Sequence, residues 1–340
     1  MLVRRMTYEA LGIVSFELVD PQGSDLPSFA AGAHIDVRVP GGFVRQYSLH
    51  NHPQERHRYC IAVLKERPGT GGSRSMHENV RVGDLLTISY PRCHFRVADG
   101  AHRHLLLAGG IGVTPIISML EYLAETSREF VLHYCTRTKG ATAFLERMAV
   151  LAEHGEIFNH YDNGDPATGL DISALLAGYR DGTHLYCCGP AGFMRAVEQA
   201  CQHWPRGSVH FEHFSPPVMP ADHVTAPRDP ASEFQIQIGE NGPILAVPPE
   251  RSIVQVLREH FIEVETSCEA GICGTCKTRY LAGEPQHNDF VLTDAEKREW
   301  VMICCARSKS ALLVLDIETA EGAPAERMSD IHGDAQERVV

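Results

Sequence analysis

The sequence predicts a multidomain chain in which an antiparallel β-barrel is followed by an α/β domain with a parallel sheet and then by a small α+β domain. Three observations support this prediction. The 340 residues exceed what one hydrophobic core usually holds. Apolar residues keep the period of strands up to about residue 100 and then alternate between strand and helix periods. Eleven cysteines are present, and several of them are crowded into one C-terminal stretch.

Composition excludes several classes of partner. The formal net charge of −12 at pH 7 disfavours nucleic acid and anionic membranes, because both require a net basic face. Residues 1–12 carry neither the apolar core nor the cleavage pattern of a secretory signal. The best membrane candidate, residues 105–120, is too short and is interrupted by glycines and a proline. We therefore expect a cytoplasmic protein with reduced cysteines and with no nucleic-acid or membrane partner.

Residues 1–100 form the predicted barrel domain, because short runs with strand character are separated there by Gly, Pro and Asp turns. These runs are residues 14–19, 34–39, 43–50, 59–65 and 85–90. The third run contains RQYSL, in which alternation puts Arg45 and Tyr47 on one face and Ser48 on the other. An arginine binds phosphate and a tyrosine ring packs on an isoalloxazine, although an ordinary strand with a surface arginine has the same pattern. The glycine-rich segment 71–75 is a second candidate for binding an anion.

Residues 101–214 form the predicted α/β domain, in which strands alternate with helices. Its first strand, LLLA, runs into the turn GGIG and a helix, and a pyrophosphate binds well at such a helix N-terminus. This segment contains Gly110, Gly112, Thr114 and Pro115. A later strand ends in the same way at Cys188, Gly189 and Pro190. Either turn alone is also compatible with simple strand–helix packing, but two such ends at one sheet edge indicate a dinucleotide site.

The C-terminal third divides into a linker, a domain and a tail. Residues 215–232 contain five prolines among small and polar residues, which is typical of an extended linker. Residues 233–318 begin with the strands FQIQIG and ILAVP, continue with a helix at about 252–260 and end with the strand ALLVLDIE. Residues 319–340 carry few apolar groups and are predicted to be a disordered tail.

The crowded cysteines have the spacing of an iron–sulfur site. Cys268, Cys273 and Cys276 form a C-x4-C-x2-C run, and a fourth thiol follows 28 or 29 residues later at Cys304 or Cys305. This is the plant-type [2Fe–2S] spacing. A structural zinc site usually takes its ligands as two close pairs, and the adjacent Cys304 and Cys305 fit that arrangement poorly. Spacing alone does not decide between the two candidates for the fourth ligand.

Together these motifs resemble the phthalate dioxygenase reductase and vanillate demethylase reductase family. The resemblance covers roughly residues 5–318. It depends on RQYSL, GTGGSRSMHENVRVGD, GGIGVTPI, LYCCGPAGFM, HFEHF, CEAGICGTCKT and VMICCARSKSALLVLDI, which occur in the family's order. It implies a flavin-binding β-barrel, a pyridine-nucleotide α/β domain and a ferredoxin of the β-grasp type.

The resemblance also implies roles for individual residues. In the barrel, Arg45 is expected to contact the flavin phosphate and Tyr47 and Ser48 the ring, with a second phosphate loop formed by Gly72, Ser73 and Ser75. The resemblance implies that Phe214 shields the flavin. It also implies that the nucleotide site contains Gly110, Gly112, Thr114, Pro115, Cys188, Gly189 and Pro190. Aligning the segment VMICCARSKS assigns the fourth iron ligand to Cys304.

The cofactors and partner follow from the same resemblance. Members with a C-terminal ferredoxin resemble FMN enzymes, so FMN is expected rather than FAD. NADH is the expected donor, although Arg137 and Lys139 near the adenosine ribose could tolerate NADPH. The family passes electrons to a separate terminal oxygenase with a Rieske centre. The chain itself lacks the combined pattern of such a centre, in which a C-x-H is followed by a C-x2-H.

The predicted reaction is hydride transfer from NADH to the flavin, followed by single-electron transfer to the cluster and to the oxygenase. The alternatives are a reductase for a haem protein or a quinone, and a non-catalytic redox-sensing or zinc-binding protein. An acidic docking face is a further hypothesis, with a solvated loop as the alternative. Its members are Glu284, Asp289, Asp294, Glu296 and Glu299.

Overall fold

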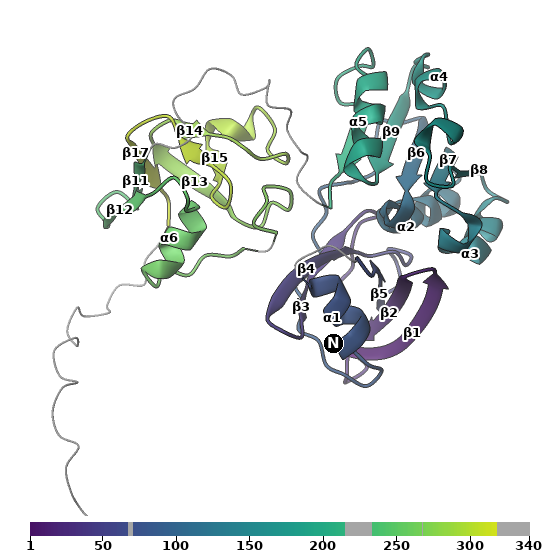
Figure 1. The fold of residues 1–340 in the computed structure, drawn as a ribbon, viewed down its shortest axis with the longest axis horizontal. Helices are drawn as coiled ribbons and strands as arrows, with labels where there is room; N and C mark the ends of the chain where they lie inside the picture. The colour runs from purple at the N-terminus through teal and green to yellow at the C-terminus, as the bar shows by residue number, and fades with distance from the viewer. Residues whose placement is uncertain (67–70, 215–232, 267, 318–340) are drawn as a thin grey trace, which may run out of the picture. The chain divides into compact units, whose positions relative to one another are not determined.

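The computed structural model describes residues 1–66, 71–214, 233–266 and 268–317 (Figure 1). The chain forms two compact units. The first comprises Met1–Pro227, Glu265–Cys276 and Asn288–Thr293, and the second comprises Arg228–Val264, Lys277–His287 and Asp294–Val340. The predicted linker, residues 215–232, and the predicted tail, residues 319–340, lie outside the described residues.

The N-terminal part of the first unit contains two antiparallel sheets and a short helix. One sheet has the order β1-β2-β5, from β1 (Leu2–Ala10), β2 (Ile13–Val19) and β5 (Tyr59–Leu64). The other pairs β3 (His34–Val39) with β4 (Phe43–Ser48), and α1 (Gly72–Asn79) packs against β3, β4 and β5. The branched and aromatic side chains Phe16, Ile35 and Ile61 are fully buried in the core that these elements share.

The strands of this part differ from the prediction at residues 85–90 and at β1, and barrel closure is not shown. The described residues form two sheets linked by isolated bridges, such as Leu49 with Ile61, and these pairings do not close a barrel. Residues 85–90, predicted as a strand, contribute only bridges at Leu85 and Ile88. Strand β1 was not predicted, because its alternate residues are mostly polar and only partly buried.

The α/β part of the first unit has the predicted parallel sheet, in the order β10-β9-β6-β7-β8. Its strands are β6 (Arg103–Gly109), β7 (Glu129–Thr136), β8 (Glu156–Tyr161), β9 (Thr183–Cys188) and β10 (Val209–Glu212). Its helices are α2 (Val113–Glu125), α3 (Leu145–Leu151), α4 (Ile172–Leu176) and α5 (Ala191–Ala200), with 3-10 turns η1 (Gly110–Gly112), η2 (Lys139–Ala141) and η3 (Pro166–Thr168).

Helices cover both faces of this sheet (Figure 1). Residues of α2 and α3 share a core with Leu106 and Leu132, whereas residues of α4 and α5 share a core with Leu107 and Leu185. Adjacent residues of β6 therefore point into opposite cores, as a parallel strand covered on both sides requires. The chain order reverses between β6 and β9, and this reversal creates the crevice where α/β sheets bind ligands.

The second unit contains a mixed sheet in the order β12-β11-β17-β13-β15 and one helix. Its elements are β11 (Phe234–Ile238), β12 (Ile244–Val247), α6 (Ile253–Glu259), β13 (Lys277–Ala282), β14 (Pro285–Gln286), η5 (Glu296–Arg298), β15 (Trp300–Met302), β16 (Arg307–Ser308) and β17 (Leu312–Leu315). Helix α6 begins at a capping box in which Ser252 and Gln255 satisfy each other's backbone N–H groups. This confirms the helix predicted at about 252–260.

The described residues contain no helix that is both long enough and apolar enough to cross a membrane.

Candidate functional site

The carboxyl ends of β6 and β9 approach each other at backbone contact distance. We call residues 109–112 and 188–190 the nucleotide edge. A Cβ atom added to Gly112 would lie 2.3 Å from the carbonyl oxygen of Cys188, and one added to Gly189 would lie 3.0 Å from the Cα of Gly109. Real side chains do not fit at these distances, so glycine is required at both positions. The structure thus brings the two predicted glycine motifs together.

The other predicted residues of the nucleotide edge lie at the start of α2 and α5. Thr114 is buried, and its hydroxyl donates a hydrogen bond of 3.0 Å to the carbonyl of Ile111, which stabilises the turn. Pro115 occupies the first turn of α2, where a missing N–H has no effect. Pro190 is the residue that precedes α5. The starts of two helices therefore lie at this edge, where helix N-termini favour an anion.

Cys188 is completely buried at the end of β9. Burial raises the pKa of its thiol well above the usual value, and the carboxyl of Glu212 adds to this effect. The thiol is therefore protonated at neutral pH and is not a nucleophilic thiolate. Its place beside the nucleotide edge suits a small packing group.

Glu212 is a site residue that the sequence reasoning did not assign. It pairs with Cys188 in the register of β9 and β10, and its side chain is 14% exposed. Burial raises the pKa of its carboxyl to about 8, and the Cys273 thiol adds to this effect. A carboxylate flanked by aromatic residues in the strand HFEHF was the available signal.

His34 lies opposite Glu212, with its Nδ1 atom 3.8 Å from the Glu212 Oε1 atom. The histidine is 3% exposed, and neither ring nitrogen has a hydrogen-bond partner among the described residues. Burial, with the neighbouring Arg92 and His94, lowers the pKa of His34 to about 4. At neutral pH the two side chains therefore form an uncharged contact rather than an ion pair.

The predicted phosphate residues of the N-terminal part also come together. A Cβ atom on Gly72 would lie 2.7 Å from the Nε atom of Arg45, so the guanidinium of β4 lies directly against the start of α1. Gly71 allows this approach with a φ of 99°, and no side chain caps the helix. A guanidinium beside uncapped helix N–H groups is a suitable phosphate site.

The strand that carries Arg45 also has buried polar atoms without partners. Neither the hydroxyl of Tyr47 nor the amide nitrogen of Gln46 has a hydrogen-bond partner among the described residues. Burial raises the pKa of Tyr47, which keeps its hydroxyl protonated. Ser48 is buried and pairs with His34 in the β3–β4 register. These unsatisfied groups fit a bound cofactor that has both a flat ring and polar edges.

The two serines of the glycine-rich segment have different environments. The Ser75 hydroxyl donates to the carbonyl of Pro40 over 2.6 Å, so its proton is already used. The Ser73 hydroxyl accepts a bond of 3.3 Å from the backbone N–H of Glu66 and keeps its own proton for a ligand. Phe214 is 43% exposed at the end of the described α/β part.

The predicted iron ligands Cys268, Cys273 and Cys276 lie in one segment of the first unit, residues 268–276, which we call the cysteine loop. Gly271 and Gly274 have φ angles of 72° and 75°, so the loop curls through conformations that favour glycine. The backbone N–H of Ala270 donates to the Cys268 sulfur over 3.3 Å.

The cysteine loop also favours a thiolate. Hydrogen bonding with Cys268, and then with Thr275, lowers the pKa of Cys273 to about 6 in spite of its burial. Thiolates with backbone N–H donors are what an iron–sulfur cluster requires, so the donor set fits that cofactor. Among the described residues, no three His, Cys, Asp or Glu side chains are gathered around the position of a single metal ion.

Cys304 and Cys305, the two candidates for the fourth ligand, follow β15 in the second unit and differ in burial. Strands β13 and β15 place Lys277 opposite Met302. Cys276 directly precedes Lys277, and Cys304 follows Met302 by two residues. Cys304 is 6% exposed, whereas Cys305 is more exposed and its sulfur donates to the Met302 carbonyl over 3.6 Å.

Three of the five acids of the predicted docking face have partners within their own part of the chain. Asp289 is 8% exposed, and its Oδ1 atom accepts a bond of 2.8 Å from the backbone N–H of Leu292. The carboxylates of Glu284 and Glu296 form ion pairs with Lys309 and Lys277, respectively. Asp294 and Glu299 are exposed, and the docking face stays a prediction.

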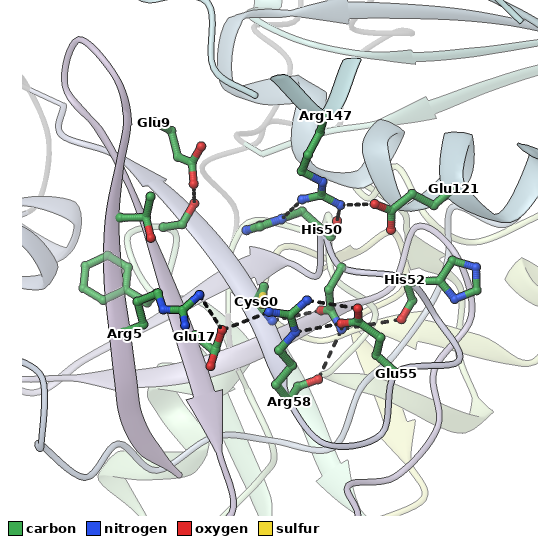
Figure 2. Close-up of a pocket in the computed structure, with 14 residues that line it drawn as sticks. Arg5, Glu9, Glu17, His50, His52, Glu55, Arg58, Cys60, Glu121 and Arg147 are labelled. Carbon is green, nitrogen blue, oxygen red and sulfur yellow. Dashed lines mark hydrogen bonds and ion pairs between the residues drawn. The ribbon is translucent and has the colours of Figure 1, made fainter. Parts of the chain in front are cut away.

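A polar pocket of about 270 Å³ lies elsewhere in the first unit (Figure 2). Arg147 of α3 donates to the Nδ1 atom and to the carbonyl of His50, each over 2.7 Å, and also bonds to Glu121 of α2. Burial and the Arg147 charge hold the pKa of His50 well below its usual value. None of the described residues that line this pocket is a predicted site residue. We call the contacts of Arg147 with His50 and Glu121 the polar seam, which lies between the N-terminal sheets and the helices of the α/β part.

Comparison with known proteins identifies two domain families in the chain. Residues 236–309 match Fer2, the 2Fe-2S iron-sulfur cluster binding domain. Residues 90–205 match the N-terminal domain of the family described as dimethylamine monooxygenase subunit DmmA-like. The first match contains the cysteines Cys268, Cys273, Cys276 and Cys304.

Curated relatives align with nearly the whole chain. The reductase subunit of tert-butanol monooxygenase / tert-amyl alcohol desaturase from Aquincola tertiaricarbonis is 47% identical and covers 93% of this chain and 95% of its own. The vanillate O-demethylase oxidoreductase of Pseudomonas sp. (strain HR199 / DSM 7063) is 45% identical, with 93% and 99% covered. The phthalate dioxygenase reductase of Burkholderia cepacia is 42% identical, with 91% and 94% covered.

Solved structures give the same result. Phthalate dioxygenase reductase, described as a modular structure for electron transfer from pyridine nucleotides to [2Fe-2S], matches with a TM-score of 0.68 and 40% identity. That match covers 93% of this chain and 97% of the solved one. An intact type IV self-sufficient cytochrome P450 monooxygenase matches with a TM-score of 0.82 and 35% identity, but this chain spans only 40% of its length.

Gly112→Ala tests the backbone contact at the nucleotide edge. The new Cβ would clash with the Cys188 carbonyl, so we expect NADH to bind at least about tenfold more weakly, as a misplacement near 1 Å produces. The matched control is Gly178→Ala, because a Cβ there meets nothing within 4 Å. NADH titration measures the dissociation constant. Equal affinities in the two variants would contradict the assignment.

Arg147→Ala tests the polar seam. Removing the guanidinium leaves the buried His50 and the partly buried Glu121 without this partner, which should cost about 2 kcal/mol. For a unit of this size the loss corresponds to a fall of about 5 °C in the thermal midpoint. Substitution of the exposed Arg180 by alanine is the control and should leave the midpoint unchanged. Equal midpoints for both variants would show that the seam does not stabilise the unit.

Proposed function

The chain belongs to the family of phthalate dioxygenase reductase and vanillate O-demethylase oxidoreductase, and we propose that it is the reductase component of a two-component oxygenase. It is an NAD(P)H-dependent oxidoreductase that uses a flavin and a [2Fe–2S] cluster. One observation carries the proposal: the two glycine motifs meet at the nucleotide edge in the same compact unit that contains the cysteine loop. The donor site and the acceptor site of an electron path would therefore lie within one unit.

The electron donor and the electron acceptor handle different numbers of electrons at a time, so a third cofactor is required between them. NADH gives up two electrons and one proton together as a hydride and becomes NAD⁺. A [2Fe–2S] cluster accepts one electron at a time, by reduction of one ferric iron to ferrous. A flavin held by Arg45 and the start of α1 would supply the conversion from a hydride to single electrons, so each NADH would support two reductions of the cluster.

The residues of the N-terminal part support FMN as that flavin. Arg45 and the start of α1 would hold the phosphate, and Tyr47 and Ser48 would contact the ring. Cys188 and Phe214 would lie beside the nicotinamide and the flavin as packing groups that exclude water, with Thr114 holding the turn below them. The role of this chain is to bind, orient and shield, because no acid–base step is needed for hydride transfer.

The domain boundaries belong to the same proposal. A flavin barrel at residues 1–100, a nucleotide domain at 101–214 and a ferredoxin domain of the β-grasp type at 233–318 would match the modular relatives. The cluster ligands would be Cys268, Cys273, Cys276 and Cys304, supported by the burial of Cys304 and the pairing of β13 with β15. We also propose a cytoplasmic location, because reduced pyridine nucleotide is the substrate.

We propose a terminal oxygenase with a Rieske centre as the electron acceptor. The support is that relatives are named as reductase components of monooxygenase and dioxygenase systems. A haem protein is the second candidate, and the match to a self-sufficient cytochrome P450 favours it. Turnover with each class of purified acceptor separates the two, because productive coupling requires two one-electron reductions of the acceptor for each NADH consumed.

Cys273→Ser tests the division of labour between the cofactors. We expect the variant to lose electron delivery to a protein acceptor and to keep NADH-driven reduction of ferricyanide, which takes electrons directly from a flavin. Cys305→Ser is the matched control, since Cys305 neighbours the proposed ligand and is not itself one. Steady-state assays with both acceptors give the result. Loss of both activities in Cys273→Ser would refute the proposed order of cofactors.

The nucleotide preference is a separate prediction. Arg137 and Lys139 follow β7 and are exposed, so neither is held in place to recognise a 2′-phosphate. We expect kcat/KM for NADH to exceed that for NADPH by about tenfold or more, which corresponds to about 1.4 kcal/mol. Steady-state kinetics with both nucleotides measures the ratio, and a ratio near one would contradict the preference.

A further inference from the structure

Two histidines of the first unit lie against the cysteine loop, and the function proposed above uses neither of them. A Cβ atom placed on Gly274 would lie 2.8 Å from the Nε2 atom of His94 and 3.0 Å from its Cε1 atom. The ring of His213 lies 5.9 Å from the ring of Phe290, at an interplanar angle of 43°. The loop therefore touches an imidazole directly at one point and is reached by a second imidazole through Phe290.

Phe290 connects the second histidine to the loop itself. Its backbone N–H donates a hydrogen bond of 3.0 Å to the carbonyl of Gly271. The two contacts thus engage the two glycines at which the loop turns, Gly271 and Gly274, one on each side of Cys273. A loop held on both sides of one cysteine has a defined orientation of that sulfur. Gly274 cannot carry a side chain while His94 keeps its place, so the approach is as close as the backbone allows.

The two histidines come from different parts of the first unit. His94 follows Arg92, whose backbone exchanges hydrogen bonds of 2.8 and 3.0 Å with His34 of β3. His213 directly follows Glu212, the last residue of β10. One histidine therefore belongs to the flavin-binding part and the other to the α/β part. The loop is held by both of the parts that would position the flavin and the nicotinamide.

Between His94 and His213 lies the buried contact of His34 with Glu212 that was described above. The Nδ1 atom of His34 lies 3.8 Å from Glu212, and the rings of His34 and His94 are 6.0 Å apart. The loop residues that His94 and Phe290 engage, Gly274 and Gly271, lie on either side of Cys273 in the chain, so the part of the loop that contacts the rest of the unit is the part that carries Cys273.

We propose that His94 and His213 are positioning residues that seat the cysteine loop with Cys273 toward the flavin site and thereby set the rate of electron transfer between the two cofactors. The inference rests on the proposed function, because it assumes that the loop holds the cluster. Each electron that crosses this contact oxidises the bound flavin by one electron and reduces one iron from ferric to ferrous. Electron transfer between two fixed cofactors slows steeply as their separation grows. Contacts that hold the loop close to the flavin site therefore raise the rate without taking part in the chemistry.

The test uses the full chain loaded with flavin and cluster, with the variants His94→Ala and His213→Ala. Stopped-flow absorption after mixing with NADH follows flavin reduction and then cluster reduction. We expect cluster reduction to slow severalfold in each variant, because electron transfer weakens steeply as the loop moves away from the flavin site. Flavin reduction by NADH and turnover with ferricyanide should be unchanged. Hydrogen–deuterium exchange of the loop backbone should rise in the oxidised protein, which provides a readout independent of activity.

Matched variants separate positioning from loss of folding. His203→Ala removes another exposed histidine of the same unit and should behave as the parent protein. His213→Phe keeps a ring against Phe290 and should restore the rate that His213→Ala loses. His94→Asn replaces His94→Ala if the alanine variant fails to retain iron, and all proteins are compared at equal iron and flavin content.

The outcomes distinguish the two levels of the proposal. Parent protein whose cluster is not reduced by NADH would refute the proposed function itself. If the cluster of the parent protein is reduced normally and both alanine variants keep its rate, the positioning role of the two histidines is refuted and the proposed function stands. Faster loop exchange with an unchanged rate would also overturn the positioning role, because the histidines would then stabilise the loop without controlling electron transfer. Slow cluster reduction, rescue by His213→Phe and increased loop exchange would together support it.

Discussion

Backbone approach at the ends of β6 and β9 is the constraint on which the site depends. Gly112 and Gly189 have no room for a side chain, so the carboxyl ends of the two strands meet as bare backbone. That closeness puts the starts of α2 and α5 at one edge, where their N–H groups favour an anionic cofactor. It also fixes the position of Cys188, and the register of β10 then places Glu212 beside it.

The buried polar pair of Glu212 and His34 connects this edge with the rest of the first unit. Burial moves their pKa values in opposite directions, to about 8 and about 4, so the pair is uncharged at neutral pH. An uncharged polar pair avoids the desolvation cost of a buried ion pair while it keeps groups able to hydrogen-bond near the cofactors. The adjacent cysteine loop has the opposite character, because hydrogen bonds there favour a thiolate at Cys273.

Local patterns allowed much of the fold to be predicted, and the misses have physical causes. The β–α alternation after residue 101, the helix capped by Ser252 and the glycine turn before α2 all carry local signals of capping or periodicity. Strand β1 lacks such a signal, because pairing with β2 rather than an apolar face makes it a strand. Asp289 seemed to belong to a solvated acidic segment, but its carboxylate is buried and bonds to backbone N–H groups.

The amino-acid sequence alone determined the kinds of cofactor, because the C-x4-C-x2-C run, RQYSL and the two glycine motifs are local arrangements of ligand atoms and small residues. Only the tertiary structure decided which groups meet. Glu212 and Cys188 are neighbours through strand register, Arg45 and Gly72 through the packing of α1, and His94 and Gly274 through contacts between segments some 180 residues apart. Such long-range contacts depend on chain packing as a whole, and short-range residue patterns contain no information about them.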